Sequence, residues 1–180
     1  MLIDRHQSLL LIVDIQEKLA PAIHEGAAAI ANNQRLLAAA DRLGVPIVVS
    51  EQYVRGLGPT VPALQPLPPR AQRFEKMHFS CAREPGFLDL IADSGRRRII
   101  VTGMEAHVCV LQTVLGLLDA GYAVCLVEDA TSSRTPANRA AAISRMREAG
   151  ADIVTTEMVL FEWLARAGTD EFRTLLPLIK

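Results

Sequence analysis

Three side chains in this sequence, a cysteine, an aspartate and a lysine, could together carry out nucleophilic chemistry. Cys109 falls in the first turn of an expected helix, where free backbone N–H groups and the positive end of the helix dipole favour a thiolate and can hold an oxyanion. Asp14 directly follows an apolar run, and a carboxylate at such a position could act as a general base. Lys76, beyond an irregular segment, would favour the charged forms of both groups if it reached them.

Each of these residues also has an ordinary structural explanation. Asp14 could cap the next helix, Cys109 could pack in the core as most cysteines do, and Lys76 could be a solvated surface lysine. The position of Cys109 at a helix start distinguishes it from Cys125, which lies inside an expected strand, and from Cys81, which we expect to pack or to line a loop.

Other motifs for catalysis or cofactor binding are absent. His107 lies two residues before Cys109, and side chains at that spacing on a helix do not face each other, so it is a poor base for the thiol. It could still line a pocket. No paired histidine or cysteine spacing predicts a metal site, and no phosphate-binding, dinucleotide-binding or serine-elbow motif is present. We therefore expect neither a metal nor a cofactor.

The elements that must position these residues alternate between apolar strands and helices. Strands are expected at 8–13, 46–50, 98–103, 122–128 and 151–155, and helices at 27–43, 84–93, 107–120, 136–150 and 157–167. The strands are apolar on both faces, and four helices end at a glycine that precedes a strand. This pattern predicts one α/β domain over residues 1–180, a three-layer α/β/α sandwich with a central, mostly parallel, Rossmann-like sheet. Asp14 and Cys109 would then lie at its carboxyl edge, on neighbouring strands.

The segment 51–72 is rich in proline and glycine and follows the second expected strand. Long irregular segments inside compact domains are often functional. Because ligands bind at the carboxyl edge of open α/β sheets, we expect this segment to lie there and to line a binding site for a small molecule.

Composition restricts the partners and the compartment. The net charge is −1 and the pI about 6.4, so no general attraction to nucleic acid or to an anionic membrane is expected. No apolar run reaches the roughly 18 residues that span a bilayer, and no signal peptide pattern is present, which together predict a reduced, cytoplasmic location. Half of the residues are hydrophobic, which favours a homo-oligomer. The apolar segment 158–164 could form its interface or pack on the sheet.

Several motifs resemble the isochorismatase-like cysteine hydrolases over nearly the whole chain. They are Val13-Asp14-Ile15-Gln16, Phe74-Glu75-Lys76 and the stretch from Val101 to Val110, which contains a glycine six residues before Cys109, supported by the segment 129–134. The subgroup of isochorismatase domain-containing proteins is similar in three further places, namely Glu51-Gln52-Tyr53, residues 56–60 and residues 157–162.

This resemblance implies the same three-layer fold and a catalytic triad. Asp14 would take the thiol proton of Cys109, the thiolate would attack a carbonyl carbon, and Lys76 would bridge the two electrostatically. The resemblance also implies a cis peptide bond between Met104 and Glu105, and an oxyanion hole made by the backbone N–H groups of Glu105 and Cys109. Nicotinamidases of this family bind a metal through an Asp-x-His motif after the second strand. The segment 50–54 contains no histidine, so a metal-independent enzyme is expected here.

The leading hypothesis is hydrolysis of a small amide, although the sequence does not name the substrate. Candidate pocket residues are Gln16, Gln52, Tyr53, Phe79 and His107. Three alternatives stay open. The chain could be a regulator that keeps the triad but binds a metabolite or a protein. It could be an isochorismate-type vinyl-ether hydrolase, which needs no thiol. It could also be a thiol redox sensor.

Overall fold

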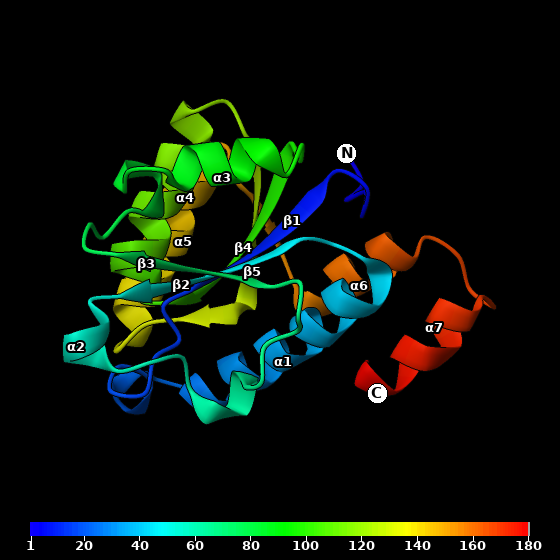
Figure 1. Ribbon diagram of the computed structural model, residues 1–180, viewed down its shortest axis with the longest axis horizontal. Coiled ribbons are helices and arrows are strands. Elements are labelled where there is room, and N and C mark those ends of the chain that lie inside the picture. The colour runs from blue at the N-terminus through cyan, green and yellow to red at the C-terminus, as the bar shows by residue number, and fades with distance from the viewer. Residues whose placement is uncertain (180) are drawn as a thin grey trace.

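Six parallel strands form one sheet in the computed structural model, which describes residues 1–179 (Figure 1). The strand order is β3-β2-β1-β4-β5-β6, and every neighbouring pair is parallel. This arrangement confirms the α/β prediction, with a sheet that is parallel throughout. The strands are β1 Ser8–Val13, β2 Ile47–Gln52, β3 Gln72–Lys76, β4 Arg98–Met104, β5 Ala123–Ser132 and β6 Asp152–Val154.

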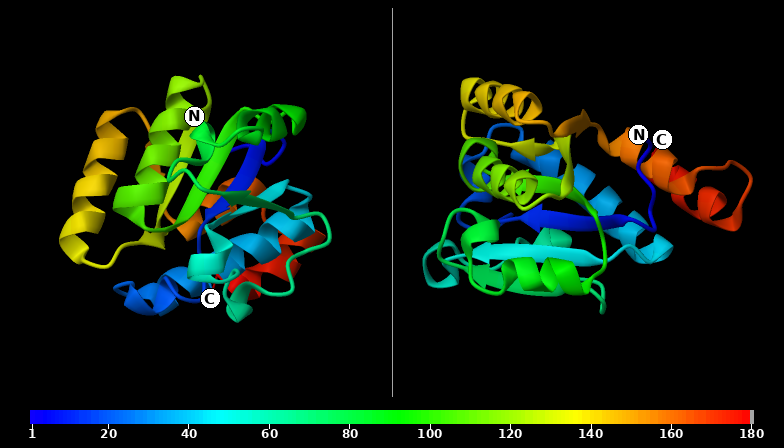
Figure 2. Two further views of the ribbon diagram at one scale, coloured as in Figure 1. Left: turned by 60° about the vertical axis from the view of Figure 1, so that its left-hand side comes forward. Right: turned by 90° about the horizontal axis from the view of Figure 1, so that it is seen from above.

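Helices cover both faces of the sheet (Figure 2). One layer consists of α1 Gly26–Leu43, α6 Thr156–Leu164 and α7 Asp170–Leu175, and the other of α3 Phe87–Asp93, α4 Leu111–Asp119 and α5 Pro136–Glu148. Short elements complete the described chain: α2 Val54–Leu57, a π-helical turn Ala106–Val110, and 3-10 turns at Ala20–Ala22, Pro62–Leu64, Cys81–Arg83 and Leu176–Leu178.

Strand β1 explains why both faces are covered. Its side chains alternate between the two halves of the core, with Leu10 and Ile12 packed against the α1 layer and Leu9, Leu11 and Val13 against the α3 layer. All six residues of this strand are buried. A continuous apolar strand of this kind is stable only in the middle of a sheet that is covered on both sides. Its carboxyl end therefore lies near the centre of the sheet edge.

The structure adds elements that the sequence pattern did not predict. Strand β3 was not expected, because its residues are mostly polar and exposed and it pairs with β2 alone, as an edge strand. The apolar patterning that revealed the other five strands is absent from it. Helix α7 was also not expected. The predicted helix 107–120 divides into the π-helical turn and α4.

The location predicted for segment 51–72 is wrong in part. Because β3 is parallel to β2, the chain must return to the amino edge of the sheet before β3 begins. Only the first part, residues 53–60, stays beside the carboxyl edge. The second part, residues 61–71, runs back beside α1, where Val61 and Leu64 are buried.

The apolar segment 158–164 mostly packs inside the chain. Val159, Leu160, Trp163 and Leu164 are buried in the core, whereas Met158 and Phe161 are 44% and 43% exposed. No helix within residues 1–179 is both long and apolar enough to cross a bilayer.

Candidate active site

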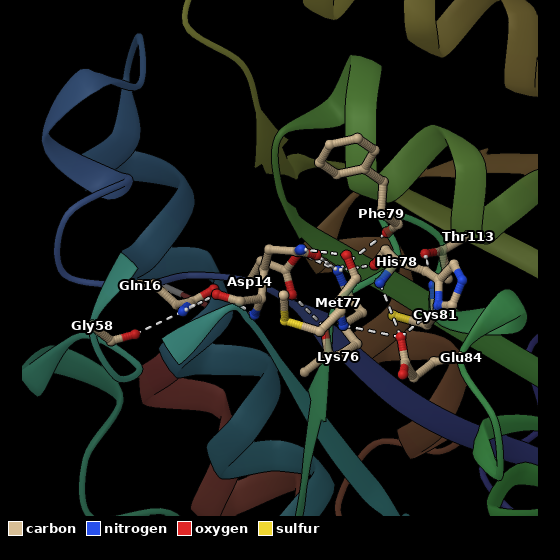
Figure 3. Close-up of polar contacts among 12 residues, drawn as sticks. Asp14, Gln16, Gly58, Lys76, Met77, His78, Phe79, Cys81, Glu84 and Thr113 are labelled. Carbon is tan, nitrogen blue, oxygen red and sulfur yellow. Dashed lines mark hydrogen bonds and ion pairs between the residues drawn. The ribbon is translucent and has the colours of Figure 1, made fainter. Parts of the chain in front are cut away.

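A buried ion pair lies at the carboxyl edge of the sheet. Asp14 follows β1 and Lys76 ends β3, and the Lys76 Nζ donates a hydrogen bond of 2.7 Å to the Asp14 Oδ2 (Figure 3). Both side chains are completely buried. Asp14 has a left-handed backbone with φ 50°, which turns the chain sharply at the strand end. Sequence reasoning predicted that these two residues would come together, and the fold brings them together across β2.

Lys76 is saturated by acceptors from the protein. Besides Asp14, its Nζ donates to the Gln52 Oε1 at 2.7 Å and to the backbone oxygens of His78 at 3.3 Å and Phe79 at 3.1 Å. An ammonium group has three N–H donors, so four acceptors use all of them. Burial is the largest single influence and lowers the pKa of Lys76, but the negative charge of Asp14 and the smaller raising influences together outweigh it, so the pKa is raised. Lys76 is therefore charged and acts on the site through its field.

The backbone acceptors of Lys76 belong to a turn that Glu84 holds from outside. The Glu84 Oε2 accepts hydrogen bonds of 2.9 Å from the backbone N–H groups of Met77 and His78, and lies 2.8 Å from the His78 Nδ1 (Figure 3). The backbone hydrogen bond from His78 is the main cause that lowers the pKa of Glu84. The turn after β3 is thus fixed on both sides.

Cys109 lies near the same carboxylate, on the π-helical turn. In this turn Val110 and Leu111 donate their N–H groups to the carbonyl oxygens five residues earlier, those of Glu105 and Ala106. Short π-helical segments of this kind are frequent at functional sites. The Cys109 thiol lies close enough to Asp14 and Lys76 for both charges to act on it, and the residue is only 6% exposed. The three predicted catalytic residues are therefore grouped at one edge of the sheet.

The protonation state of Cys109 differs from the prediction. Burial is the largest cause that raises the pKa of Cys109 above its ordinary value, and the negative charge of Asp14 adds to it. The positive charge of Lys76 opposes both but does not overcome them. The expectation that the helix start and Lys76 favour a resting thiolate was therefore wrong. The thiol is neutral at rest, with the carboxylate of its proposed base nearby.

Glu105 precedes the π-helical turn, and its peptide bond with Met104 is cis, as expected. The Glu105 carboxylate is bound by Arg134 in a bidentate pair of 2.7 and 2.8 Å, and that hydrogen bonding is the main cause that lowers its pKa. The oxyanion role of the backbone N–H groups of Glu105 and Cys109 stays a prediction.

Gln16 and Gln52, two of the predicted pocket residues, are occupied within the protein. The Gln16 amide is fully buried, exchanges two hydrogen bonds with the Gln52 backbone and donates to the carbonyl oxygen of Gly58 at 2.6 Å. It ties residues 53–60 to the strand ends. The Gln52 amide faces Lys76, as described above. Both side chains support the site from within the protein. The prediction that they line the pocket was therefore wrong.

The other three predicted pocket residues lie nearer to solvent. Tyr53 is 50% exposed and Phe79 is 55% exposed. Tyr53 also lines a cavity of about 350 Å³ to which Lys76 and Met77 contribute. His107 is half-buried, and its ring contacts the Ser133 Oγ at 3.0 Å and the Asn138 side chain at 3.3 Å. It connects the π-helical turn to the segment after β5.

Sequence reasoning missed two further residues beside the ion pair. The Ser50 Oγ donates a hydrogen bond of 2.6 Å to the Asp14 Oδ1. Cys81 is fully buried, its pKa is raised to about 11 mainly by burial, and its backbone N–H donates to the Thr113 Oγ1 at 2.9 Å. Because side chains alternate along a strand, Ser50 and Gln52 could have been placed on one face of β2. That β2 lies between the strands of Asp14 and Lys76 follows only from the strand order. Within residues 1–179, no three His, Cys, Asp or Glu side chains are grouped so that they could hold a metal.

Comparison with known families gives one clear match. A family model described as the isochorismatase domain matches residues 8–158, a range that includes Asp14, Lys76 and Cys109. The chain is similar to isochorismatase domain-containing protein 2 of Xenopus laevis, with 36% identity over 172 residues, which cover 96% of this chain and 83% of the relative.

A second relative bears on the expected compartment. The secreted isochorismatase effector Isc1 of Phytophthora sojae is 37% identical over 179 residues, which cover 97% of this chain and 85% of the relative. Because that relative is described as secreted, the cytoplasmic location of this chain stays a prediction. Among solved structures, MAR1 ribonuclease from Caenorhabditis elegans matches with a TM-score of 0.93 and 37% identity, covering 99% of this chain and 92% of that one.

Proposed function

Because the chain belongs to the isochorismatase family of hydrolases, as its motifs predicted, we propose that it is a metal-independent cysteine hydrolase of small amides. One observation carries the proposal. The buried Asp14 carboxylate forms an ion pair with Lys76, and its charge acts on the nearby thiol of Cys109. The chain's own side chains thus supply a nucleophile, a base and a compensating charge.

In the first half of the proposed reaction, the thiol is acylated. Asp14 takes the proton from Cys109 as the sulfur attacks the carbonyl carbon, and the carbonyl oxygen becomes an oxyanion. The backbone N–H groups of Glu105 and Cys109 would stabilise that charge. The carbon–nitrogen bond then breaks, the proton on Asp14 passes to the leaving amine, and a thioester remains on Cys109.

In the second half, water releases the acid. Asp14 takes a proton from a water molecule as the water oxygen attacks the thioester carbon. The proton then passes from Asp14 to the sulfur when the carbon–sulfur bond breaks. The products are a carboxylic acid and an amine. Lys76 keeps its own proton throughout, because all its N–H donors are bound within the protein.

Acyl chemistry is favoured over vinyl-ether hydrolysis by the presence of the Cys109 thiol near the buried Asp14 carboxylate. A vinyl ether is cleaved after protonation and does not need a thiol nucleophile. A thiol placed near a buried carboxylate is of use mainly when a covalent bond forms at the sulfur. The exposed rings of Tyr53 and Phe79 would offer apolar contacts to the part of the substrate outside the reacting group.

A screen of small amides and ureides for release of amine or ammonia tests this function. The wild-type chain should turn over members of the panel, and Cys109→Ala should lower kcat by at least about a thousandfold. A chelator should leave the wild-type rate unchanged. RNA belongs in the same panel, because one similar structure is that of MAR1 ribonuclease.

Two results would contradict the proposal. Full activity of Cys109→Ala would exclude the thiol as nucleophile, and loss of activity on chelation would exclude the metal-independent reaction. Binding of a panel member without turnover and without a covalent adduct would favour a regulatory protein that retains the triad.

A further inference from the structure

Strand β2 lies between the two strands that carry the ion pair. In the sheet, Ser50 is the neighbour of Val13, the residue before Asp14, and Gln52 is the neighbour of Lys76. Ser50 and Gln52 are two residues apart on one strand, so their side chains point to the same face of the sheet. One contacts Asp14 and the other contacts Lys76.

We propose that Ser50 and Gln52 are positioning residues that hold the ion pair in the arrangement from which Asp14 takes the proton of Cys109. This inference rests on the proposed function and extends it to two residues that would act through Asp14 and Lys76 without touching the substrate.

Ser50 fixes the orientation of the base. Its hydroxyl donates to the Asp14 Oδ1 at 2.6 Å, while Lys76 binds the Oδ2 at 2.7 Å. A carboxylate bound at both oxygens from two directions cannot rotate about its carbon–carbon bond without losing a short hydrogen bond. Without the hydroxyl, only Lys76 would hold this side chain from the sheet side, and the oxygen facing Cys109 would no longer be defined.

Gln52 fixes the orientation of the cation. Its Nε2 donates to the carbonyl oxygen of Met77 at 2.9 Å, so its Oε1 must face Lys76, from which it accepts at 2.7 Å. The amide is neutral, so it holds the ammonium group without competing with Asp14 as a second charge would. It also ties the lysine to the turn whose backbone oxygens complete its coordination.

The roles of Ser50 and Gln52 can be tested without changing the charges around Asp14. The ionisable groups that face it are Lys76 from β3, Cys109 from the π-helical turn and Cys81 from the turn after β3. Ser50 and Gln52 are uncharged. Replacing either with an apolar residue therefore leaves the net charge of the site unchanged, and any effect on Cys109 would arise from the arrangement of the pair.

The experiment measures the rate at which iodoacetamide alkylates Cys109 between pH 6 and 10, with the modified residue located by tandem mass spectrometry. Ser50→Ala and Gln52→Met should react about tenfold more slowly than wild type near neutral pH, where the thiol needs its base. The difference should narrow as the pH rises, because hydroxide then competes with Asp14 as the base for the thiol. A purely structural role would not produce this pH-dependent difference.

Matched variants separate the hydroxyl from packing. Ser50→Thr and Ser50→Val have nearly the same shape, and only the first keeps the hydroxyl, so Thr should restore the wild-type profile and Val should not. This pair also decides the question if Ser50→Ala does not fold. Glu51→Gln is the control on the same strand. Glu51 is buried on the opposite face, where it binds Thr60, so this variant should keep the wild-type profile.

Asp14→Asn distinguishes failure of this inference from failure of the proposed function. If Asp14→Asn alkylates as fast as the wild type or faster, Asp14 is not the base and the proposed function fails. If Asp14→Asn is slow but Ser50→Ala, Ser50→Val and Gln52→Met match the wild type, only the positioning roles are overturned. Equal slowing in Ser50→Thr and Ser50→Val would also overturn the role of the hydroxyl.

Discussion

Cys109 is a neutral thiol at rest and lies near the carboxylate of its proposed base, Asp14. Burial keeps the pKa of Cys109 above its ordinary value, so the thiol stays protonated at rest. Proton transfer to Asp14 is then favoured only when the sulfur gains a bond to carbon. A nucleophile of this kind is protected from unproductive oxidation, because the thiolate is the form that reacts with oxidants.

The ion pair should contribute to stability as a unit. Lys76→Met would leave the buried Asp14 charge without its partner, which typically costs about 3–5 kcal/mol. The double variant Asp14→Asn/Lys76→Met buries no uncompensated charge, so it should lose less than the sum of the two single variants. Urea unfolding followed by the fluorescence of Trp163, the only tryptophan, would measure all four proteins. Additive losses would show that the two side chains are not coupled.

Cys81 should make the protein less stable at alkaline pH. Burial raises its pKa from 9.0 to about 11, so the folded protein keeps a proton that the unfolded chain releases. Its contribution is fully present below pH 9 and is lost as the pH rises toward 11, with a total of roughly 2–3 kcal/mol.

Comparison with Cys81→Ala isolates this effect from that of other groups. Between pH 8 and pH 10, the wild-type free energy of unfolding should fall more steeply than that of the variant, by roughly half of the total. Parallel curves over that range would indicate that the Cys81 thiol titrates alike in the folded and unfolded states.

At the scale of elements, the site depends on the close approach of β1 and β4. Gly103 has φ +116°, and a Cβ atom at this position would lie 2.0 Å from the carbonyl oxygen of Val13. No side chain can give way there, because the contact is with backbone. The register of β4 against β5 also shifts at this point, between Val101 and Gly103.

Gly103→Ala should therefore cost more than about 3 kcal/mol, or prevent folding, since left-handed strain alone costs roughly 1–3 kcal/mol and the strands must also separate. Gly121→Ala is a matched control. Gly121 has φ +85° but no atom within 4 Å of its Cβ position, so only the strain should appear. Equal losses in the two variants, measured by urea unfolding, would argue against the close contact.

Most elements could be predicted from the sequence because each carried its own signal. The apolar run 8–13 is the observed β1 without change, and Gly44 ends α1 in a left-handed conformation with φ 72°, as a terminal glycine should. Strand β3 could not be predicted, because its mostly polar residues show no apolar pattern. Only its pairing with β2 distinguishes it from a loop.

At the scale of the whole molecule, the topology assembles the site. Asp14, Cys109 and Lys76 are far apart in the sequence, and the order β3-β2-β1-β4 brings the ends of their strands together. Asp14 and Cys109 could be predicted to meet because parallel strands share an edge, whereas Lys76 was placed with them by the family resemblance, since β3 was not predicted. The hydrogen-bond network around them could not, because the contacts of Ser50 and Gln52 depend on which strand lies between β1 and β3.

We also expect the chain to associate with copies of itself. Met158 and Phe161 are three residues apart on α6 and both remain about half exposed, whereas Val159 and Leu160 between them are buried. Light scattering should give a mass that is a multiple of 19.6 kDa, and the double variant Met158→Glu/Phe161→Glu should lower it. A wild-type mass near 19.6 kDa would contradict association.

The central claim is that Cys109 becomes acylated with Asp14 as its base, and mass spectrometry of the protein during turnover of an amide found in the screen tests it most directly. The wild-type chain should gain the mass of the acyl group on Cys109, the adduct should form far more slowly in Asp14→Asn, and it should be absent from Cys109→Ala, which should not turn over. Hydrolysis of the same amide by Cys109→Ala at the wild-type rate, with no adduct on the wild-type thiol, would contradict the claim.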